Sequence, residues 1–472
     1  MSSASIAAHR RRLNGIPGGQ PRSGPLPRRI LTSPWTWVTI GMTLIFAAAL
    51  VSQYLTITAD IETKDGFVPG INASAIREAA GYAWPTLAFW VALFLLADRF
   101  RPQRPLLWYL ALGWGGTMAT FISLHVNTWA AEQLSITGVG DPSTGARAAI
   151  YIAPFVEEAA KASILFWIAI LVRYRLTTKL NGIALAGLSA AGFAFTENII
   201  YYARAIVYSS QTIEVGDAQA AVQSLVFLRG VATAFGHPLF TMMTGVGLVV
   251  ALRTHSKVVR VLAPVTGYLI AALLHMVFNS QAGLSQGMSQ QLLYFLVALP
   301  LVFSAAMFGV RQVVAEGRLI RNRLGDFVRM GWLPAADPVV ASRQRSRLWA
   351  LLVALTRGWT NFVATVRLQR ALTELAYLRD AEVRGVIDAT ASARAKELLE
   401  LIGSVRPLAV DDPRGQRLTL PRLRRPRPGE FPPPSYPGPQ GLGGMWAQPG
   451  GPVPLGSPSY SPVDPTWGPP SR

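Results

Sequence analysis

Residues 149–174 read AIYIAPFVEEAAKASILFWIAILVRY, and this stretch decides how the chain folds. It is long and apolar enough to cross a bilayer as one helix, yet Glu157, Glu158 and Lys161 interrupt its middle. An ionisable side chain in the hydrocarbon costs on the order of 3 kcal/mol or more. Three such groups on adjoining turns therefore indicate a buried polar site inside a membrane protein.

The composition of the whole chain agrees with a membrane protein. The 472 residues are 51% hydrophobic and only 15% charged, which is too apolar for a soluble protein of this length. There is no cysteine, so disulfides and thiolate metal sites are excluded. The net charge of +19 lies in short loops and tails beside apolar stretches. This pattern predicts anionic headgroups at the cytoplasmic face as partners, and no nucleic acid.

The fold class that we expect is all-α, a polytopic transmembrane helix bundle of about eight spans. The apolar stretches that define these spans cover residues 35–57, 81–98, 105–126, 149–173, 182–204, 222–252, 259–281 and 289–311. The sixth is long, and we expect it to be tilted or to extend beyond the bilayer.

The charges between the spans predict the orientation. Arg and Lys gather in the N-terminal segment and in every second connection, whereas the alternate connections carry mainly Asp and Glu. By the positive-inside rule, both termini of this multi-pass protein of the cell membrane are expected in the cytoplasm. No cleavable signal peptide is expected, because the first 34 residues are polar and rich in Arg.

Four regions follow from these patterns. We expect a basic cytoplasmic tail over residues 1–34 and an eight-span domain over residues 35–311. A basic helical cytoplasmic region is expected over residues 312–405, where Leu recurs near helical spacing. Residues 406–472 are rich in Pro and Gly and cannot bury a core, so we expect them to be disordered.

Polar groups on four expected spans lie at similar depth, towards the external face. Glu157 and Glu158 are about two turns from the outer end of their span, and Glu197 is at a similar distance in the next. His237 is near the middle of its span, and His275 is in the outer half of another. We therefore expect these five side chains to converge in one cavity.

The glutamate pair has a structural and a functional interpretation. Lys161 is placed i+4 from Glu157 and i+3 from Glu158, so the three share one helix face. A buried ion pair that only fixes helix packing needs one glutamate. A second, adjacent carboxylate favours a shared proton, which general acid–base catalysis uses. We expect Lys161 to keep one glutamate ionised, with Glu158 or Glu197 as its partner.

Glu197, His237 and His275 also have a structural and a functional interpretation. Glu197 has no basic partner in its own span and, in the structural interpretation, pairs with Lys161 from the neighbouring helix. A single membrane histidine is usually a packing residue, but His237 and His275 follow each other on consecutive spans and face carboxylates. Arg229 lies two turns before His237 and is a candidate counter-charge or oxyanion donor.

The four motifs are Glu157-Glu158-x-x-Lys161, Phe193-x-x-x-Glu197-Asn198, His237-x-x-x-Thr241 and His275-x-x-x-Asn279. In this order on successive spans they resemble the motif series of the PrsW family of intramembrane proteases. That family is distantly similar to the CAAX-processing and bacteriocin-immunity membrane peptidases. The resemblance covers about residues 80–285. Where those relatives carry His in the second motif, this chain carries Glu197. The resemblance implies peptide-bond hydrolysis in a membrane-anchored protein, such as an anti-sigma factor.

Two mechanisms remain open for this hydrolysis. In one, His237, His275 and a carboxylate hold zinc, and Glu157 or Glu158 is the base for its bound water. In the other there is no metal, Glu157 activates a water positioned by the histidines, and Asn279 is the oxyanion donor. The expected catalytic groups are Glu157, Glu158, Lys161, Glu197, Asn198 and Asn279, with His237 and His275 as metal ligands or water-positioning groups.

Two other classes of function are alternatives to proteolysis. A transporter or channel with a proton relay also uses intramembrane Glu, Lys and His, but the sequence shows no inverted repeat and no matched pair of broken spans. A membrane scaffold acting through its cytoplasmic tail leaves the polar groups on four spans unexplained. Proteolysis is therefore the leading hypothesis.

Overall fold

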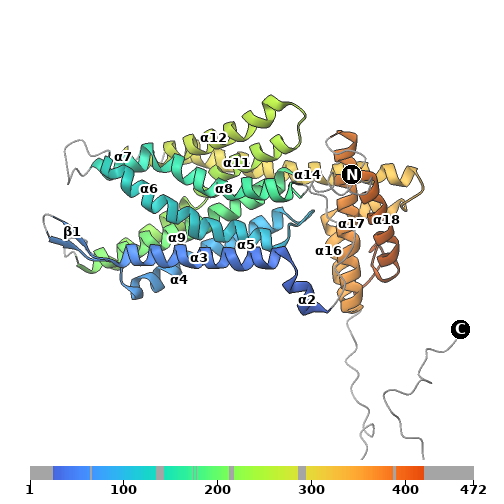
Figure 1. Cartoon of the computed structure of the whole chain (residues 1–472), viewed down its shortest axis with the longest axis horizontal. Coiled ribbons are helices and arrows are strands. Elements are labelled where there is room, and N and C mark those ends of the chain that lie inside the picture. The colour runs from blue at the N-terminus through green and yellow to red at the C-terminus, as the bar shows by residue number, and fades with distance from the viewer. Residues whose placement is uncertain are drawn as a thin grey trace, which may run out of the picture. The chain divides into compact units, whose positions relative to one another are not determined.

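The structure is a computed structural model that describes residues 25–63, 66–133, 143–173, 175–176, 178–211, 217–284, 294–385 and 390–418. The chain divides into two units, Met1–Pro421 and Arg422–Arg472, and the second lies outside the described residues. Within the first unit, helices account for most of the described residues, in agreement with the expected all-α bundle (Figure 1).

The N-terminal half of the membrane region is built from helices and one short hairpin. Its elements are α2 (Leu26–Leu31), α3 (Pro34–Thr58), β1 (Ile61–Thr63), β2 (Gly66–Val68), α4 (Ala73–Ala97), α5 (Pro105–Trp114), the π-helical η1 (Gly115–Ala119) and α6 (Thr120–Gln133). The two strands pair antiparallel, with Ile61 opposite Val68. Helix α4 begins where the Asn72 side chain accepts a hydrogen bond from the Ala75 N–H, which satisfies one of the donors at the helix start.

The second half carries the motifs. Its elements are α7 (Ser143–Tyr151), α8 (Ala153–Val172), α9 (Lys179–Gln211), α10 (Ala218–Phe227), the π-helical η3 (Leu228–Ala232), α11 (Gly236–Leu252), α12 (Lys257–Leu284), the π-helical η4 (Tyr294–Ala298) and α14 (Leu299–Arg329). Residues 149–173, expected as one span, are divided between the end of α7 and the whole of α8.

Six helices within the described residues are long and apolar enough to cross a membrane. They make the chain a multi-pass membrane protein. The other two expected spans, 105–126 and 149–173, are helical but are not among these six. The count of eight therefore stays a prediction.

The sixth expected span, 222–252, is not one continuous helix. It consists of α10, η3 and α11, and the helix is interrupted at Thr233, Ala234 and Phe235. Pro238 in the first turn of α11 has no N–H with which to continue a helical ladder across this point. The break places His237 in the first turn of a new helix.

Helix α9 is the centre of the bundle. Two-thirds (67%) of its most apolar segment is buried, against 17% for α3 and for α4. Its glycines let neighbouring helices approach closely: a Cβ on Gly182 would collide with the carbonyl oxygen of Gly245 in α11, and the reverse also holds. Without side chains at these positions, the two backbones that carry Glu197 and His237 pack directly together.

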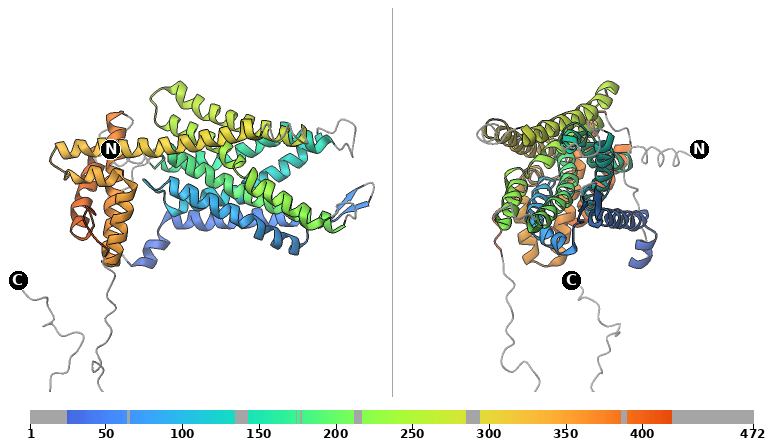
Figure 2. Two further views of the ribbon diagram at one scale, coloured as in Figure 1. Left: turned by 180° about the vertical axis from the view of Figure 1, so that it is seen from behind. Right: turned by 90° about the vertical axis from the view of Figure 1, so that its left-hand side faces the viewer.

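Beyond the membrane helices, the chain forms a second helical group. It contains the later turns of α14, then α15 (Ala336–Ser342), α16 (Gln344–Thr356), α17 (Trp359–Val383), α18 (Thr390–Val405) and the 3-10 turn η5 (Arg406–Leu408). Figure 2 shows α14, drawn in yellow, extending from the bundle into this group. Buried Ile320, Leu324 and Leu375 belong to its core. Arg347 joins it to the connection between α4 and α5 through a hydrogen bond of 3.2 Å to the carbonyl of Phe100.

Two regional boundaries differ from their expected positions. Helix α14 runs without a break through residues 311 and 312, so that boundary coincides with no change in structure. The expectation of disorder from residue 406 is wrong for residues 406–418, because Val410 is buried against α16 and its N–H donates to the Thr365 hydroxyl. Apolar Val410 and the ion pairs of Arg406 outweigh the polar composition around them. Residues 419–472 of the expected tail lie outside the described residues, as do residues 1–24.

Candidate functional site

Helix α8 contributes the glutamate pair and the lysine. Glu157, Glu158 and Lys161 are all buried, and Lys161 and Glu158 have no measurable exposure. The Lys161 Nζ donates to Glu157 Oε2 at 3.2 Å and to Glu158 Oε1 at 3.0 Å. The helix therefore brings one ammonium between two adjacent carboxylates, as the i+3 and i+4 spacing predicted. The same ammonium lies 3.8 Å from the centre of the Phe193 ring.

Lys161 also contacts His237, and this contact determines where the imidazole proton lies. The Nζ is 2.9 Å from His237 Nδ1, and His237 Nε2 is 2.9 Å from Glu197 Oε2. An ammonium has donors only, so Nδ1 accepts. Nε2 then carries the proton and donates it to Glu197. Both nitrogens of His237 are thus engaged.

Glu197 pairs with Arg229. Arg229 Nη2 donates to Glu197 Oε2 at 2.6 Å, and its Nε donates to Asn198 Oδ1 at 2.8 Å. The guanidinium stacks over Tyr201, with 3.9 Å to the ring centre. The structural interpretation in which Glu197 pairs with Lys161 is not what the structure shows. Arg229 is its counter-charge, one of the two roles that the sequence suggested.

Glu158 is held from three sides. Besides Lys161, Thr241 Oγ1 donates to Glu158 Oε2 at 2.7 Å, and His275 Nδ1 lies 3.1 Å from Glu158 Oε1. His275 Nε2 is 3.9 Å from Glu157 Oε2. His275 itself is buried and stacks on Phe240. One carboxylate thus joins α8, α11 and α12.

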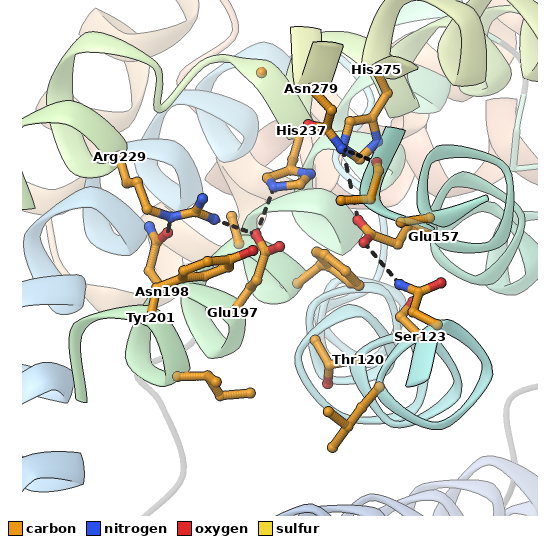
Figure 3. A pocket seen from close by; sticks show the side chains of 18 of the residues that line it. Thr120, Ser123, Glu157, Glu197, Asn198, Tyr201, Arg229, His237, His275 and Asn279 are labelled. Carbon is orange, nitrogen blue, oxygen red and sulfur yellow. Dashed lines mark hydrogen bonds and ion pairs between the residues drawn. The ribbon is translucent and has the colours of Figure 1, made fainter. Parts of the chain in front are cut away.

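A cavity of about 550 Å³ opens beside these groups (Figure 3). Glu157, Glu197, His237 and His275 line it, whereas Glu158 does not. Lys161 does not line the cavity either. The five residues that were expected to converge therefore do lie together, but in two layers: four face the cavity, and Glu158 supports them.

Asn198 and Asn279 also line the cavity. Asn279 Nδ2 donates to the carbonyl of Ala149 at 2.8 Å, which ties α12 to α7. The end of α6 and the end of α7 complete the cavity on the side of the α6–α7 connection. These two elements were not expected at the site.

Helix α6 contributes three polar residues that sequence reasoning missed. Thr120, Ser123 and Asn127 line the cavity. Figure 3 shows Thr120 and Ser123 on the side opposite the histidines. Asn127 Nδ2 donates to Glu157 Oε1 at 3.3 Å. The signal in the sequence is their i, i+3, i+7 spacing on one helix face. Neutral polar residues are common in membrane helices, so this spacing alone is weak.

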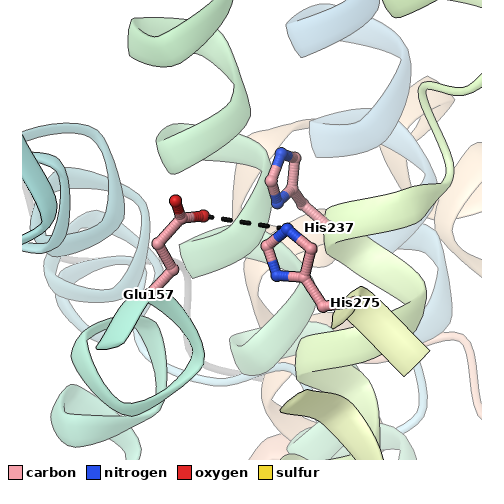
Figure 4. A group of neighbouring side chains, drawn as sticks. All are labelled: Glu157, His237 and His275. Carbon is pink, nitrogen blue, oxygen red and sulfur yellow. Dashed lines mark ion pairs between the residues drawn. The ribbon is translucent and has the colours of Figure 1, made fainter. Parts of the chain in front are cut away.

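Glu157, His237 and His275 form a group whose ligand atoms all lie within 4.8 Å of one another (Figure 4). Two histidines and a glutamate are the donor set of many catalytic zinc sites. The residue types fit zinc, but the arrangement does not. The Lys161 ammonium is within hydrogen-bond distance of both Glu157 and His237, so a fixed positive charge stands where a divalent cation would be bound.

Fold and site together define a class of protein: a polytopic helical membrane protein with a buried centre of carboxylates and histidines around a cavity. The model of the PrsW family intramembrane metalloproteases matches residues 102–305, which contain every residue of this centre. The match covers less than half of the chain, and over this region it confirms the resemblance seen in the four motifs. The family implies an intramembrane protease. No curated protein and no solved structure matches the chain.

Proposed function

We propose that the chain is an intramembrane endopeptidase that cleaves a membrane-anchored protein with a water activated by Glu157. The observation that carries this is the division of labour in the glutamate pair. Glu157 faces the cavity and lies beside His275, whereas Glu158 is turned away and fully engaged by Lys161, Thr241 and His275. A general base must reach its water, and Glu157 is the member of the pair that can.

In the proposed reaction, Glu157 takes a proton from water as the oxygen attacks the scissile carbonyl carbon. The carbonyl oxygen becomes an oxyanion, for which Asn279 is the donor that we expect. The backbone N–H of His237 is a further donor, because the Gly236 and Leu239 N–H groups already donate to the carbonyls of Thr233 and Phe235 and Pro238 has none. When the C–N bond breaks, Glu157 returns its proton to the leaving amine.

The remaining groups keep this geometry. Glu158 and Lys161 fix α8 against α11 and α12, and Arg229 orients Glu197, which in turn holds the His237 tautomer. Each of these positioning residues is itself held by at least two hydrogen bonds or ion pairs. Such preorganisation lets the polar groups act without rearrangement during the reaction. The mechanism proposed is metal-free, because Lys161 supplies the positive charge at the centre.

The membrane arrangement is part of the proposal. The charge distribution of the loops supports an arrangement of eight spans with both termini in the cytoplasm and the cavity in the outer half of the bilayer. Anionic lipids would contact the basic cytoplasmic loops. Substrates would be single-span regulators, anti-sigma factors among them, cut near their external side. The family match favours this over the proton-relay transporter.

The test is cleavage of a panel of synthetic single-span peptides by the purified protein in proteoliposomes. Glu157→Gln keeps the size of the side chain but removes the base, and it should lower the cleavage rate at least 100-fold, which a lost general base costs. The matched control is Glu78→Gln, an exposed glutamate on α4. It should cleave like the wild type. Cleavage by Glu157→Gln at the rate of the control would remove Glu157 from the mechanism.

A further inference from the structure

The polar face of α6 is the part of the cavity that the proposed mechanism leaves unused. Thr120, Ser123 and Asn127 belong to it, and Ser123 is only 4% exposed. The Thr120 hydroxyl donates to the carbonyl of Thr117 in η1, and the Thr128 hydroxyl donates to the carbonyl of Leu124 in α6. The Ser123 hydroxyl has no such bond, and no partner among the described residues.

Like Ser123, Asn127 lines the cavity and has a polar side-chain atom without a hydrogen-bond partner among the described residues. Its Nδ2 donates to Glu157, but its Oδ1 is also without a partner among the described residues. A buried polar atom without a hydrogen bond costs about 1–3 kcal/mol. Two such atoms on one helix face, at i and i+4 and both beside the cavity, are therefore suited to a ligand that brings hydrogen-bond donors.

The chemistry of a membrane substrate supplies those donors. A helix in the bilayer satisfies its own N–H and C=O groups, and its carbonyls are shielded by the neighbouring turns. Hydrolysis needs a segment in which the helix is opened. Opening leaves backbone N–H groups without acceptors in a medium of low dielectric constant, where each costs several kcal/mol.

We infer that Ser123 and Asn127 form a subsite that accepts backbone N–H groups of the substrate, where its helix is unwound beside the scissile bond. The inference rests on the proposed function and gives α6 a role in it. Asn127 also touches Glu157, so it joins the bound backbone to the base. Specificity at this subsite is for an opened backbone, and it depends on no particular side chain.

The test is a double-mutant cycle between Ser123→Ala and a change in the substrate backbone. From a single-span peptide that the wild type cleaves, a set of depsipeptides is made in which one amide N–H near the cut is replaced by an ester oxygen. At one position the ester should lower kcat/KM of the wild type about fivefold, the usual worth of one hydrogen bond. Ser123→Ala should lower kcat/KM of the all-amide peptide by a similar factor. The same ester should then cost Ser123→Ala nothing further.

Ser163→Ala is the matched control, because the Ser163 hydroxyl bonds to its own helix at Ala160 and does not line the cavity. It should show the full ester effect. The thermal stability of Ser123→Ala without substrate should equal or exceed that of the wild type, because the hydroxyl has no protein partner to lose.

The outcomes separate the subsite from the function. If the wild type cleaves peptides but every ester affects wild type and Ser123→Ala equally, the subsite is refuted and the protease remains. If the wild type cleaves no single-span peptide at all, the proposed function fails, and the subsite with it.

Discussion

The Nζ of Lys161 lies 2.9 Å from Nδ1 of His237, and this distance links two motifs that are 76 residues apart. Because the lysine can only donate, the imidazole carries its proton on Nε2, towards Glu197. Lys161 thereby connects the glutamate pair of α8 to the carboxylate of α9 through one imidazole. The tautomer of His237 therefore depends on both Lys161 and Glu197.

Lys161→Met should therefore damage more than one contact. It leaves Glu157 and Glu158 without their shared ammonium and frees His237 Nδ1. Removing one partner of a buried ion pair costs about 3–5 kcal/mol. We expect a lower thermal unfolding temperature in detergent and loss of cleavage. Lys161→Arg keeps the charge but not the compact shape. If Lys161→Met has the unfolding temperature and the cleavage rate of the wild type, the contacts of Lys161 contribute to neither stability nor cleavage.

Removal of metal should leave cleavage unchanged. The Lys161 ammonium is within hydrogen-bond distance of Glu157 and His237, two of the three residues that a zinc ion would need. We therefore expect full activity after dialysis against a strong chelator, and less than one equivalent of zinc per protein in elemental analysis. Activity lost with the chelator and restored by zinc would overturn the metal-free mechanism and require Lys161 to move away.

Truncation should locate the true end of the folded chain. A protein ending at residue 418 should match the full chain in stability and cleavage. One ending at residue 405 loses buried Val410 and the Arg406–Asp337 ion pair, and should lose about 2 kcal/mol or more. Arg406→Met should destabilise as well, whereas Arg414→Met, at an exposed pair, should not. Equal stability of both truncations would contradict this boundary.

Asp98 should make stability depend on pH. It ends α4 and accepts hydrogen bonds from Gln103, Trp108 and Asn181, and burial raises its pKa to about 7. Because this folded-state pKa is above the ordinary 3.8, its contribution is full below pH 4 and is lost as the pH rises through 7. The unfolding temperature in detergent should fall from pH 5 to pH 8.

The matched comparison is the same pH series on Asp98→Asn and on Glu78→Gln. Asp98→Asn has no carboxyl to titrate, so its unfolding temperature should vary less with pH than that of the wild type, even if it is lower throughout. Glu78→Gln removes an exposed carboxylate and should keep the wild-type slope. A slope that Asp98→Asn retains would assign the pH dependence to another group.

Much of the site could be predicted from the sequence, because charges in an apolar span are costly and so stand out. Glu157, Lys161 and His275 were identified in this way, and helical spacing correctly predicted that Lys161 reaches both glutamates. Arg229 was predicted as a candidate counter-charge, but its pairing with Glu197 was not. A guanidinium on another helix can reach many carboxylates, and only the packed structure selects one.

The other differences have physical causes of their own. Ser123 and Asn127 carry no charge, so their presence in a helix costs little and gives little signal. The interruption before Gly236 was marked only by Gly236 and Pro238 in an otherwise apolar run. Residues 406–418 resemble a linker by composition, yet one apolar side chain, Val410, and one ion pair hold them on the helical group.

Helix α14 gives the molecule a mechanical property. Its 31 residues form a rod of about 45 Å that runs from the membrane bundle to the core of the second helical group. At the start of η4, just before it, the Tyr294 hydroxyl donates to the carbonyl of Ala232, next to the interruption that precedes His237. At its other end, Leu324 and Phe327 are locked in the helical core. Because α14 continues without a break between these two contacts, a displacement of the helical group is transmitted to the interruption beside the cavity, and the reverse also holds. The fold therefore couples the shape of the cavity to the position of the helical group.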